Sequence, residues 1–219
     1  MDNNTRRLKN MAYISDTGLV LKQFKTKWFV RKYRRMISFN LPRAYYLLRC
    51  MGVHRKGFAY LEPPFSCDYG DNLYIGDNFY ANTNFTVLDV GRVTIGDNAQ
   101  IGPNVTITTA GHPLHPQARN THYEYGIDIT IGDNVWLGAG VTVLPGVHIG
   151  NNVTIGAGSV VNRDIPDNVL AAGVPCRVIR EITDEDMKYY FRDRVFDDEA
   201  WELVKSGNDD WVNIIKNKK

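Results

Sequence analysis

The stretch IGDNVWLGAGVTVLPGVHIG, residues 131–150, places an aliphatic residue every six positions and an Asn or Gly three residues after each one. A period of six is neither helical nor strictly alternating, and hexapeptide repeats are typical of a parallel β-helix. Asn and Gly reach positive φ at low cost, so they suit the corners at which each coil turns. Across the chain the pairs are Ile75/Asn78, Ile95/Asn98, Ile101/Asn104, Ile131/Asn134, Leu137/Gly140, Val143/Gly146, Ile149/Asn152 and Ile155/Gly158.

One long interruption breaks the repeat. After Ile107 the corner position is occupied by Ala110, and clean repeats resume only at Ile131, with two His-Pro pairs in between. We therefore predict that residues 108–130 form a loop extruded from the coils. Insertions in a solenoid lie on one face, often the binding face, and long loops in compact domains are usually functional.

Three regions follow from this pattern. We predict an N-terminal helical segment over residues 1–60, the β-helix over 61–180 and a C-terminal helical tail over 181–219. A further helix is expected from Pro42 to Gly52, because Pro suits the start of a helix and Gly its end. In the C-terminal tail, Thr183 is expected to cap the start of a helix and Gly207 to end another. The first helix is predicted from apolar residues at three- and four-residue steps that are expected to face the core: Leu21, Phe24, Trp28, Phe29, Tyr33, Met36 and Ile37.

Composition indicates one folded protein with a sizeable core. The 219 residues are 43% hydrophobic and 23% charged, and no apolar run approaches the roughly 20 residues of a membrane span. The start, MDNNTRRLKN, lacks the apolar centre of a signal peptide, so a cytoplasmic location is expected. Cys50, Cys67 and Cys176 have no metal-ligand spacing and are expected to be reduced thiols.

The charges are segregated although the net charge is only +2. Eleven Lys or Arg and no acid lie between Thr17 and Leu61, whereas eleven acids and four bases lie between Glu181 and Asp210. A basic stretch suits a nucleic-acid or membrane surface. Because its aromatic residues recur at helical core spacing, the sequence favours a solvated helix face and no nucleic-acid partner.

Five blocks in order carry a family resemblance. They are EPPFSCDYG (62–70), NFYAN (78–82), AGHPLHP (110–116), IGDNVWLGAGVTVLPGVHIG (131–150) and AAGVPCRVIREI (171–182). Together they resemble the hexapeptide-repeat acetyltransferases, specifically the maltose and galactoside O-acetyltransferase group. The resemblance implies a left-handed parallel β-helix, a homotrimer, acetyl-CoA as donor and a carbohydrate hydroxyl as acceptor, with no metal requirement.

His112 is the expected catalytic residue. Moving an acetyl group from a thioester to a hydroxyl needs a base near neutral pH, and imidazole has the matching intrinsic pKa. Its position in the extruded segment resembles that of the family's catalytic histidine. His115 and His122 lie nearby, but their spacing does not match a zinc site, and a packing or solvent role is the alternative for a loop histidine.

The acceptor side is expected to involve three residues. Asn82 matches the family's acceptor-contacting asparagine in NFYAN, and Asp89 is expected on the same edge of the stacked coils, where it would orient an imidazole or accept from a sugar hydroxyl. Asp68 stands where the galactoside type has serine and resembles the maltose-like members. Val90 replaces a further acid of the galactoside type, so that contact is absent.

The donor side is expected in the C-terminal coils. By resemblance, the groove for acetyl-CoA is lined by Ala139, Ala157, Asn162, Arg163, Arg177 and Arg180. Small residues suit the pantetheine arm and guanidinium groups suit phosphates, although each arginine alone also fits an ordinary surface charge. Trp136, in an outward position, is expected at a trimer interface.

The expected reaction is direct acetyl transfer in a ternary complex. Cys67 and Cys176 have no neighbouring base in the sequence and no G-x-S-x-G elbow occurs, so no covalent nucleophile is expected. Two alternatives remain: an acyltransferase for an antibiotic, serine or nucleotide sugar, and a non-catalytic β-helix that only binds or assembles.

Overall fold

All eight predicted corner residues adopt a left-handed backbone, with φ from 53° at Asn78 to 82° at Gly146. Asn84 and Asn168 form two further corners of the same kind. On one edge the asparagine amides also hydrogen bond from coil to coil, in the order Asn78, Asn98, Asn134, Asn152 and Asn168, at 2.8–2.9 Å. The corner residues therefore set the turn and the stacking together.

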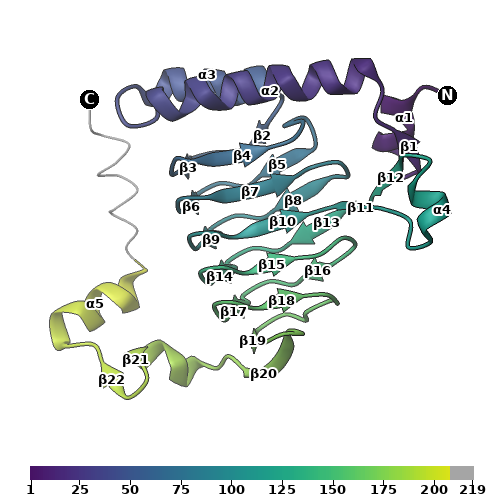
Figure 1. The fold of residues 1–219 in the computed structure, drawn as a ribbon. Coiled ribbons are helices and arrows are strands. Elements are labelled where there is room, and N and C mark those ends of the chain that lie inside the picture. The colour runs from purple at the N-terminus through teal and green to yellow at the C-terminus, as the bar shows by residue number, and fades with distance from the viewer. Residues whose placement is uncertain (208–219) are drawn as a thin grey trace. The chain divides into compact units, whose positions relative to one another are not determined.

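Between the corners, short strands stack into three walls in the computed structural model, which describes residues 1–207 (Figure 1). The first wall contains β3 (Ala59–Leu61), β6 (Phe79–Ala81), β9 (Gln100–Ile101), β14 (Trp136–Leu137), β17 (Thr154–Ile155), β19 (Val169–Ala172) and β20 (Arg177–Glu181). The second contains β4 (Phe65–Cys67), β7 (Phe85–Leu88), β10 (Thr106–Thr108), β15 (Thr142–Val143) and β18 (Val160–Val161). The third contains β2 (His54–Arg55), β5 (Leu73–Ile75), β8 (Val93–Ile95), β13 (Ile129–Ile131) and β16 (His148–Ile149). From β3 to β19 in the first wall, and throughout the other two, paired strands run parallel, which confirms the parallel β-helix.

The core is the column of residues that point inward from the three walls. All eight aliphatic residues of the repeat are at most 3% exposed. Phe65, Phe79 and Phe85 widen the column in the first coils, where their ring centroids lie 6.1–6.2 Å apart in two contacts. Continuous apolar burial is what stabilises a stack of repeats that cannot fold singly.

The three corners of each coil form three edges along the β-helix. The first edge joins the first wall to the second, the second edge joins the second wall to the third, and the third edge carries the asparagine ladder. Residues that follow strands of the second wall therefore lie on the second edge, however far apart they are in sequence.

The extruded segment lies on the second edge and is more ordered than the predicted loop. It contains β11 (Ala110–Gly111), α4 (Pro116–Arg119) and β12 (Tyr123–Gly126), and β11 pairs antiparallel with β12. We call residues 109–128 the arm. Strand β1 (Tyr13–Ile14) pairs with the other side of β12, which the sequence did not indicate, so the N-terminal segment and the arm form one three-stranded sheet.

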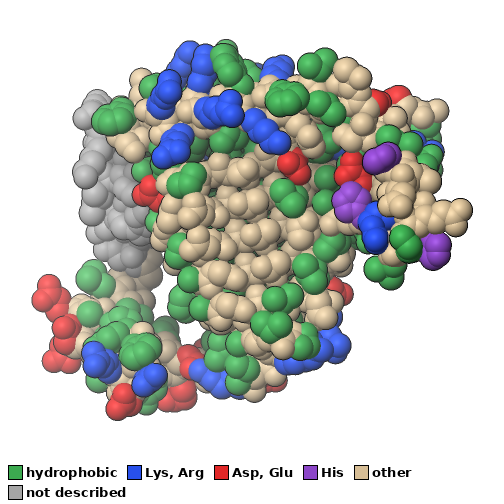
Figure 2. Space-filling view, viewed as in Figure 1, with side chains coloured by type: hydrophobic (Ala, Val, Ile, Leu, Met, Phe, Trp, Pro, Cys, Tyr) green, Lys and Arg blue, Asp and Glu red, His purple; other side chains and the backbone are tan. Residues whose placement is uncertain are grey.

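Helices α1 (Asn3–Leu8), α2 (Thr17–Met36) and α3 (Leu41–Met51) precede the coils, and α2 and α3 cover their first end (Figure 1). The helix expected from Pro42 to Gly52 is confirmed: Asn40 caps α3 and Gly52 ends it at φ 93°. Helix α2 also exists, but part of its predicted core face is wrong. Leu19, Thr26 and Tyr33, at seven-residue steps, are buried, whereas Leu21, Phe24 and Trp28 are 63%, 63% and 49% exposed. Figure 2 shows these helices carrying many Lys and Arg side chains among apolar ones.

Residues from Glu181 onward form a separate compact unit. Its described part contains a 3-10 helix η1 (Asp184–Lys188), strands β21 (Tyr189–Phe191) and β22 (Arg194–Val195) and helix α5 (Asp198–Ser206). Thr183 caps η1 and Gly207 ends α5, as expected, but an antiparallel hairpin separates the two helices. The remainder of the predicted tail, residues 208–219, lies outside the described residues.

The three cysteines are free, and Cys67 and Cys176 are buried. Within residues 1–207, no helix combines the length and apolarity needed to cross a membrane.

Candidate active site

The second edge brings together much of the predicted acceptor side. Asp68 follows β4, Asp89 follows β7 and the arm with His112 follows β10, so three successive coils place them along one edge. This placement depends on the stacking of the coils, since the residues are separated by about twenty positions each. The edge therefore combines carboxylates with the expected catalytic imidazole.

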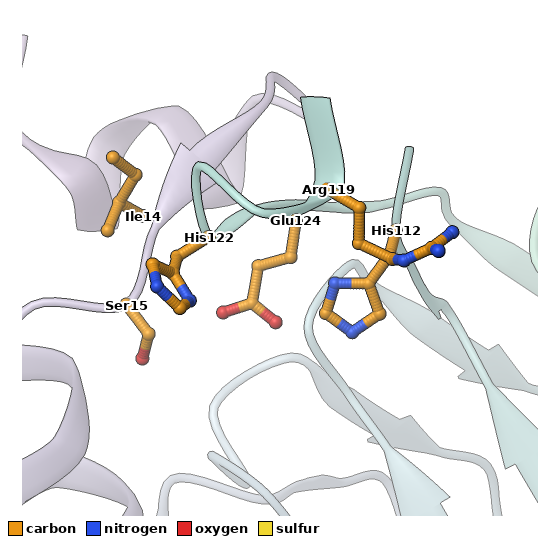
Figure 3. Close-up of a pocket in the computed structure, with 6 residues that line it drawn as sticks. All are labelled: Ile14, Ser15, His112, Arg119, His122 and Glu124. Carbon is orange, nitrogen blue, oxygen red and sulfur yellow. The ribbon is translucent and has the colours of Figure 1, made fainter. Parts of the chain in front are cut away.

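A cavity of about 600 Å³ opens between the arm and the N-terminal segment. Figure 3 shows the side chains of His112 and Glu124 pointing into it, with the His122 imidazole on the other side of the Glu124 carboxylate. Its lining residues are Ile14, Ser15, His112, Arg119, His122 and Glu124. Sequence reasoning missed Ser15, Arg119 and Glu124, because the pairing of β1 with β12 joins segments more than 100 residues apart.

Strand pairing fixes the relation between His112 and Glu124. In the β11–β12 hairpin Ala110 lies opposite Gly126 and Gly111 lies opposite Tyr125. Continued by one residue beyond the end of β11, this register sets His112 against Glu124. Directly opposed residues of an antiparallel pair point to the same face. In the sequence, the alternation of Tyr123, Glu124 and Tyr125 is compatible with a strand. It does not reveal which strand pairs with it.

Asp68 lies beside this cavity without lining it. Its side chain is half-buried, and burial raises the pKa of its carboxyl, Lys27 lowers it and Glu124 raises it. Glu124 therefore lies within electrostatic reach of Asp68, which links the corner after β4 to the arm. A carboxyl in this setting is suited to hydrogen bonding a hydroxyl group.

The expected acceptor contact of Asp89 is wrong for this structure, because its side chain is fully buried. Oδ1 accepts from the backbone N–H groups of Asp68 and Tyr69 at 2.9 Å, and Oδ2 accepts from Gly70 at 2.6 Å. Burial raises the pKa of Asp89 to about 6, against the lowering effect of these backbone hydrogen bonds. Asp89 fixes the turn that carries Asp68.

Asn82 does not share the edge of Asp89, contrary to expectation. It follows β6 and so lies on the first edge, where its side-chain oxygen accepts from the Thr83 N–H at 2.7 Å. It is not among the residues that line the cavity. The sequence pattern placed both residues on corners but did not show which wall precedes each corner.

The predicted donor residues are divided between two edges. Ala139 and Ala157 lie on the first edge in adjacent coils, where the Gly158 N–H donates to the Ala139 carbonyl at 2.8 Å. Asn162 and Arg163 follow β18 on the second edge, and Arg177 donates to Asn162 Oδ1 at 3.3 Å. Arg180 is exposed and also has an interaction partner. Small residues thus flank one side of the second wall, and polar and cationic residues flank the other.

Other chemistry finds little support in the described residues. Burial raises the pKa of Cys67 well above its ordinary value and also raises that of Cys176, which disfavours thiolate formation. No group of three or more His, Cys, Asp or Glu side chains within residues 1–207 is arranged to hold a metal ion.

Comparisons with known proteins agree with this architecture. The family described as bacterial transferase hexapeptide (six repeats) matches residues 128–163. Galactoside O-acetyltransferase of Escherichia coli (strain K12) is 48% identical over 191 residues, which cover 86% of this chain and 94% of that protein.

Two solved structures extend the similarity. A galactoside acetyltransferase in complex with coenzyme A superposes with a TM-score of 0.84 at 43% identity, covering 90% of this chain and 99% of that one. A maltose O-acetyltransferase from Clostridium difficile 630 superposes with a TM-score of 0.80 at 42% identity, covering 84% and 99%. With identity of this level over most of both chains, the protein is an acyltransferase that belongs to the galactoside and maltose O-acetyltransferase family of hexapeptide-repeat proteins.

Proposed function

We propose that this protein transfers the acetyl group of acetyl-CoA directly to a hydroxyl of a sugar, with His112 as general base and no covalent acyl-enzyme intermediate. The observation that carries the proposal is an imidazole on an ordered arm, facing a cavity beside Asp68, in a chain similar to sugar acetyltransferases. A relative of similar structure is described in complex with coenzyme A, which supports the donor.

The proposed step is a single displacement through a tetrahedral intermediate. A ring nitrogen of His112 takes the proton of the acceptor hydroxyl while that oxygen attacks the thioester carbonyl carbon. The carbon–sulfur bond then breaks, and the imidazolium returns the proton to the departing sulfur. Backbone N–H groups near the second edge are suited to stabilise the oxyanion.

Donor binding is proposed along the second wall. Ala139 and Ala157 leave room for an extended pantetheine arm on the first edge, and Arg163, Arg177 and Arg180 offer guanidinium groups to the CoA phosphates. Asn162 is held by Arg177 through a 3.3 Å hydrogen bond, which supports a common role for that pair.

A trimer with shared sites is proposed because one chain separates the expected site residues. Asn82, Ala139 and Ala157 lie on the first edge, whereas His112 and Asp68 lie on the second. A heterologous contact that closes as a ring would bring the first edge of one subunit to the second edge of its neighbour. Trp136 is 55% exposed on the first wall, as an interface residue is in a free subunit.

The acceptor is proposed to contact Asp68 and Asn82, which offer hydrogen-bonding groups for neighbouring hydroxyls. The test is release of free CoA thiol from acetyl-CoA with a panel of glucosides, galactosides, maltose, serine and a hydroxyl-bearing antibiotic. Turnover of a hexose or disaccharide, lost in the deoxy analogue, is expected. Turnover of serine or the antibiotic alone would contradict the sugar acceptor. Failure to release CoA thiol with every compound of the panel would contradict acetyl transfer.

A further inference from the structure

Three residues form a row across the small sheet of the arm. Glu124 lies on the central strand β12; Tyr13 is its direct partner on β1, and the β11–β12 register places His112 opposite it on the other side. Opposed residues of antiparallel strands share a face, so the three side chains lie in the order Tyr13, Glu124 and His112. Figure 3 shows the last two facing the same space.

Tyr13 shares an unusual feature with its buried neighbour Tyr69, whose hydroxyl also lacks a hydrogen bond of ordinary geometry within residues 1–207. The Tyr13 side chain is 0% exposed, and its hydroxyl has no such hydrogen bond within the same residues 1–207. Burial raises the pKa of Tyr13 above its ordinary value, and the neighbouring Tyr69 and Glu124 raise it further. A neutral phenol has one proton to donate, and the Glu124 carboxyl is a candidate acceptor beside it, together with the Tyr69 hydroxyl.

We infer that Glu124 is a positioning residue for His112, and that Tyr13 in turn orients Glu124. This inference rests on the proposed role of His112 as base. In the proposed arrangement, the Glu124 carboxylate accepts from one ring N–H of His112 when substrate is bound, which leaves the other ring nitrogen free to take the acceptor proton. Glu124 then stabilises the imidazolium until its proton passes to the CoA sulfur.

Buried contacts hold the segment that carries Tyr13 against the coils. Arg7 in α1 is fully buried, and its guanidinium donates to the carbonyls of Asp89 and Val90 at 3.4 and 3.2 Å and to the Asp71 carboxylate at 3.2 Å. Its guanidinium carbon also lies 4.0 Å from the centroid of the Tyr69 ring. The segment that ends in β1 is thereby fastened to the coil that carries Asp68.

His122 is the competing partner, since it lies on the other side of Glu124. The register distinguishes the two: His112 continues the paired strand β11, whereas His122 precedes β12 at a turn with φ 63°. The charged and titratable groups around Glu124 are His112, His122, Arg119, Tyr13, Tyr69 and Asp68, with Lys27 acting on Asp68.

The test uses Glu124→Gln, which keeps the shape and removes the charge. We expect kcat to fall about 10- to 100-fold with little change in the KM for acetyl-CoA, and the acid limb of the kcat/KM profile to move to lower pH. Glu124→Asp should recover part of the rate. Tyr13→Phe should lower kcat several-fold by itself but add little when combined with Glu124→Gln. The control is Tyr123→Phe, which should match wild type because Tyr123 immediately precedes Glu124 in β12 and points to the opposite face.

Each outcome separates this inference from the proposed function. Wild-type kcat and pH profile in Glu124→Gln, with His112→Ala inactive, would overturn the positioning role and leave the base assignment intact. An His122→Ala variant that reproduces the Glu124→Gln profile would also overturn it. Full activity of His112→Ala would contradict the proposed function itself. Thermal unfolding of each variant distinguishes loss of fold from loss of chemistry.

Discussion

At the scale of single residues, the asparagines of the third edge have two roles. Asn134 holds φ at 56°, and its side chain accepts from Asn98 and donates to Asn152 at 2.9 and 2.8 Å. Glycine would adopt the positive φ but could not form the side-chain hydrogen bonds. Alanine could do neither at low cost.

A pair of substitutions separates these roles. Asn134→Ala is expected to lower the free energy of unfolding by about 1–3 kcal/mol, because it combines a strained φ with two lost hydrogen bonds. Asn134→Gly should cost less, since it loses only the side-chain bonds. Urea unfolding measures both, and equal losses would contradict the backbone part of the argument.

His112 supports the sharpest prediction at this scale. Replacing it with alanine should lower kcat by about 10² to 10⁴, the usual contribution of a positioned general base, while acetyl-CoA binding stays close to wild type. His115→Ala is the matched control, because His115 lies exposed on the same arm outside the cavity. Steady-state kinetics and calorimetric titration with CoA check both parts; activity within a few-fold of wild type would refute the assignment.

At the scale of elements, the turn after β4 depends on a buried carboxylate. The folded-state pKa of Asp89, about 6, lies above the ordinary 3.8, so the folded protein binds this proton more tightly than the unfolded chain. The stabilising contribution is present below about pH 4 and is lost as the pH rises through about 6.

We expect the Asp89 contribution to lower the free energy of unfolding by roughly 2–3 kcal/mol between pH 4 and pH 7. Asp89→Asn should be destabilised at every pH, since an amide nitrogen then faces a backbone N–H, but should show a flatter pH dependence. Urea titrations across this range measure the slope. A variant with the wild-type slope would show that another group titrates there.

The last coils give a prediction about charge. If Arg163, Arg177 and Arg180 hold the CoA phosphates, each Arg→Ala change should raise the KM for acetyl-CoA several-fold and leave that of the acceptor nearly unchanged, with the difference shrinking at high ionic strength. Arg35→Ala, on the exposed side of α2, is the charge-matched control. An unchanged KM for acetyl-CoA in all three variants would show that these arginines are ordinary surface charges that do not bind the donor.

At the scale of the whole molecule, the separation of Asn82 from His112 makes the trimer testable by complementation. His112→Ala and Asn82→Ala variants, unfolded together in equal amounts and refolded, should form mixed trimers in which about one quarter of the interfaces pair two intact residues. We expect a corresponding recovery of activity, measured as thiol release. No recovery, or a fully active monomer in sedimentation, would contradict shared sites.

The sequence by itself determined the repeat, its corners and its interruption, because positive φ at Asn and Gly and inward burial every six residues are local properties of each coil. It also pointed to His112 as the candidate general base, because the motif around that residue is continuous in the chain. The tertiary structure alone decided which corners share an edge, so that Asp89 is buried beneath Asp68 and Asn82 lies apart from both. It likewise decided which stripe of α2 faces the core and that Tyr13, Glu124 and His112 form one row. These depend on the register of segments far apart in sequence, and no local backbone preference encodes which strand will be the neighbour.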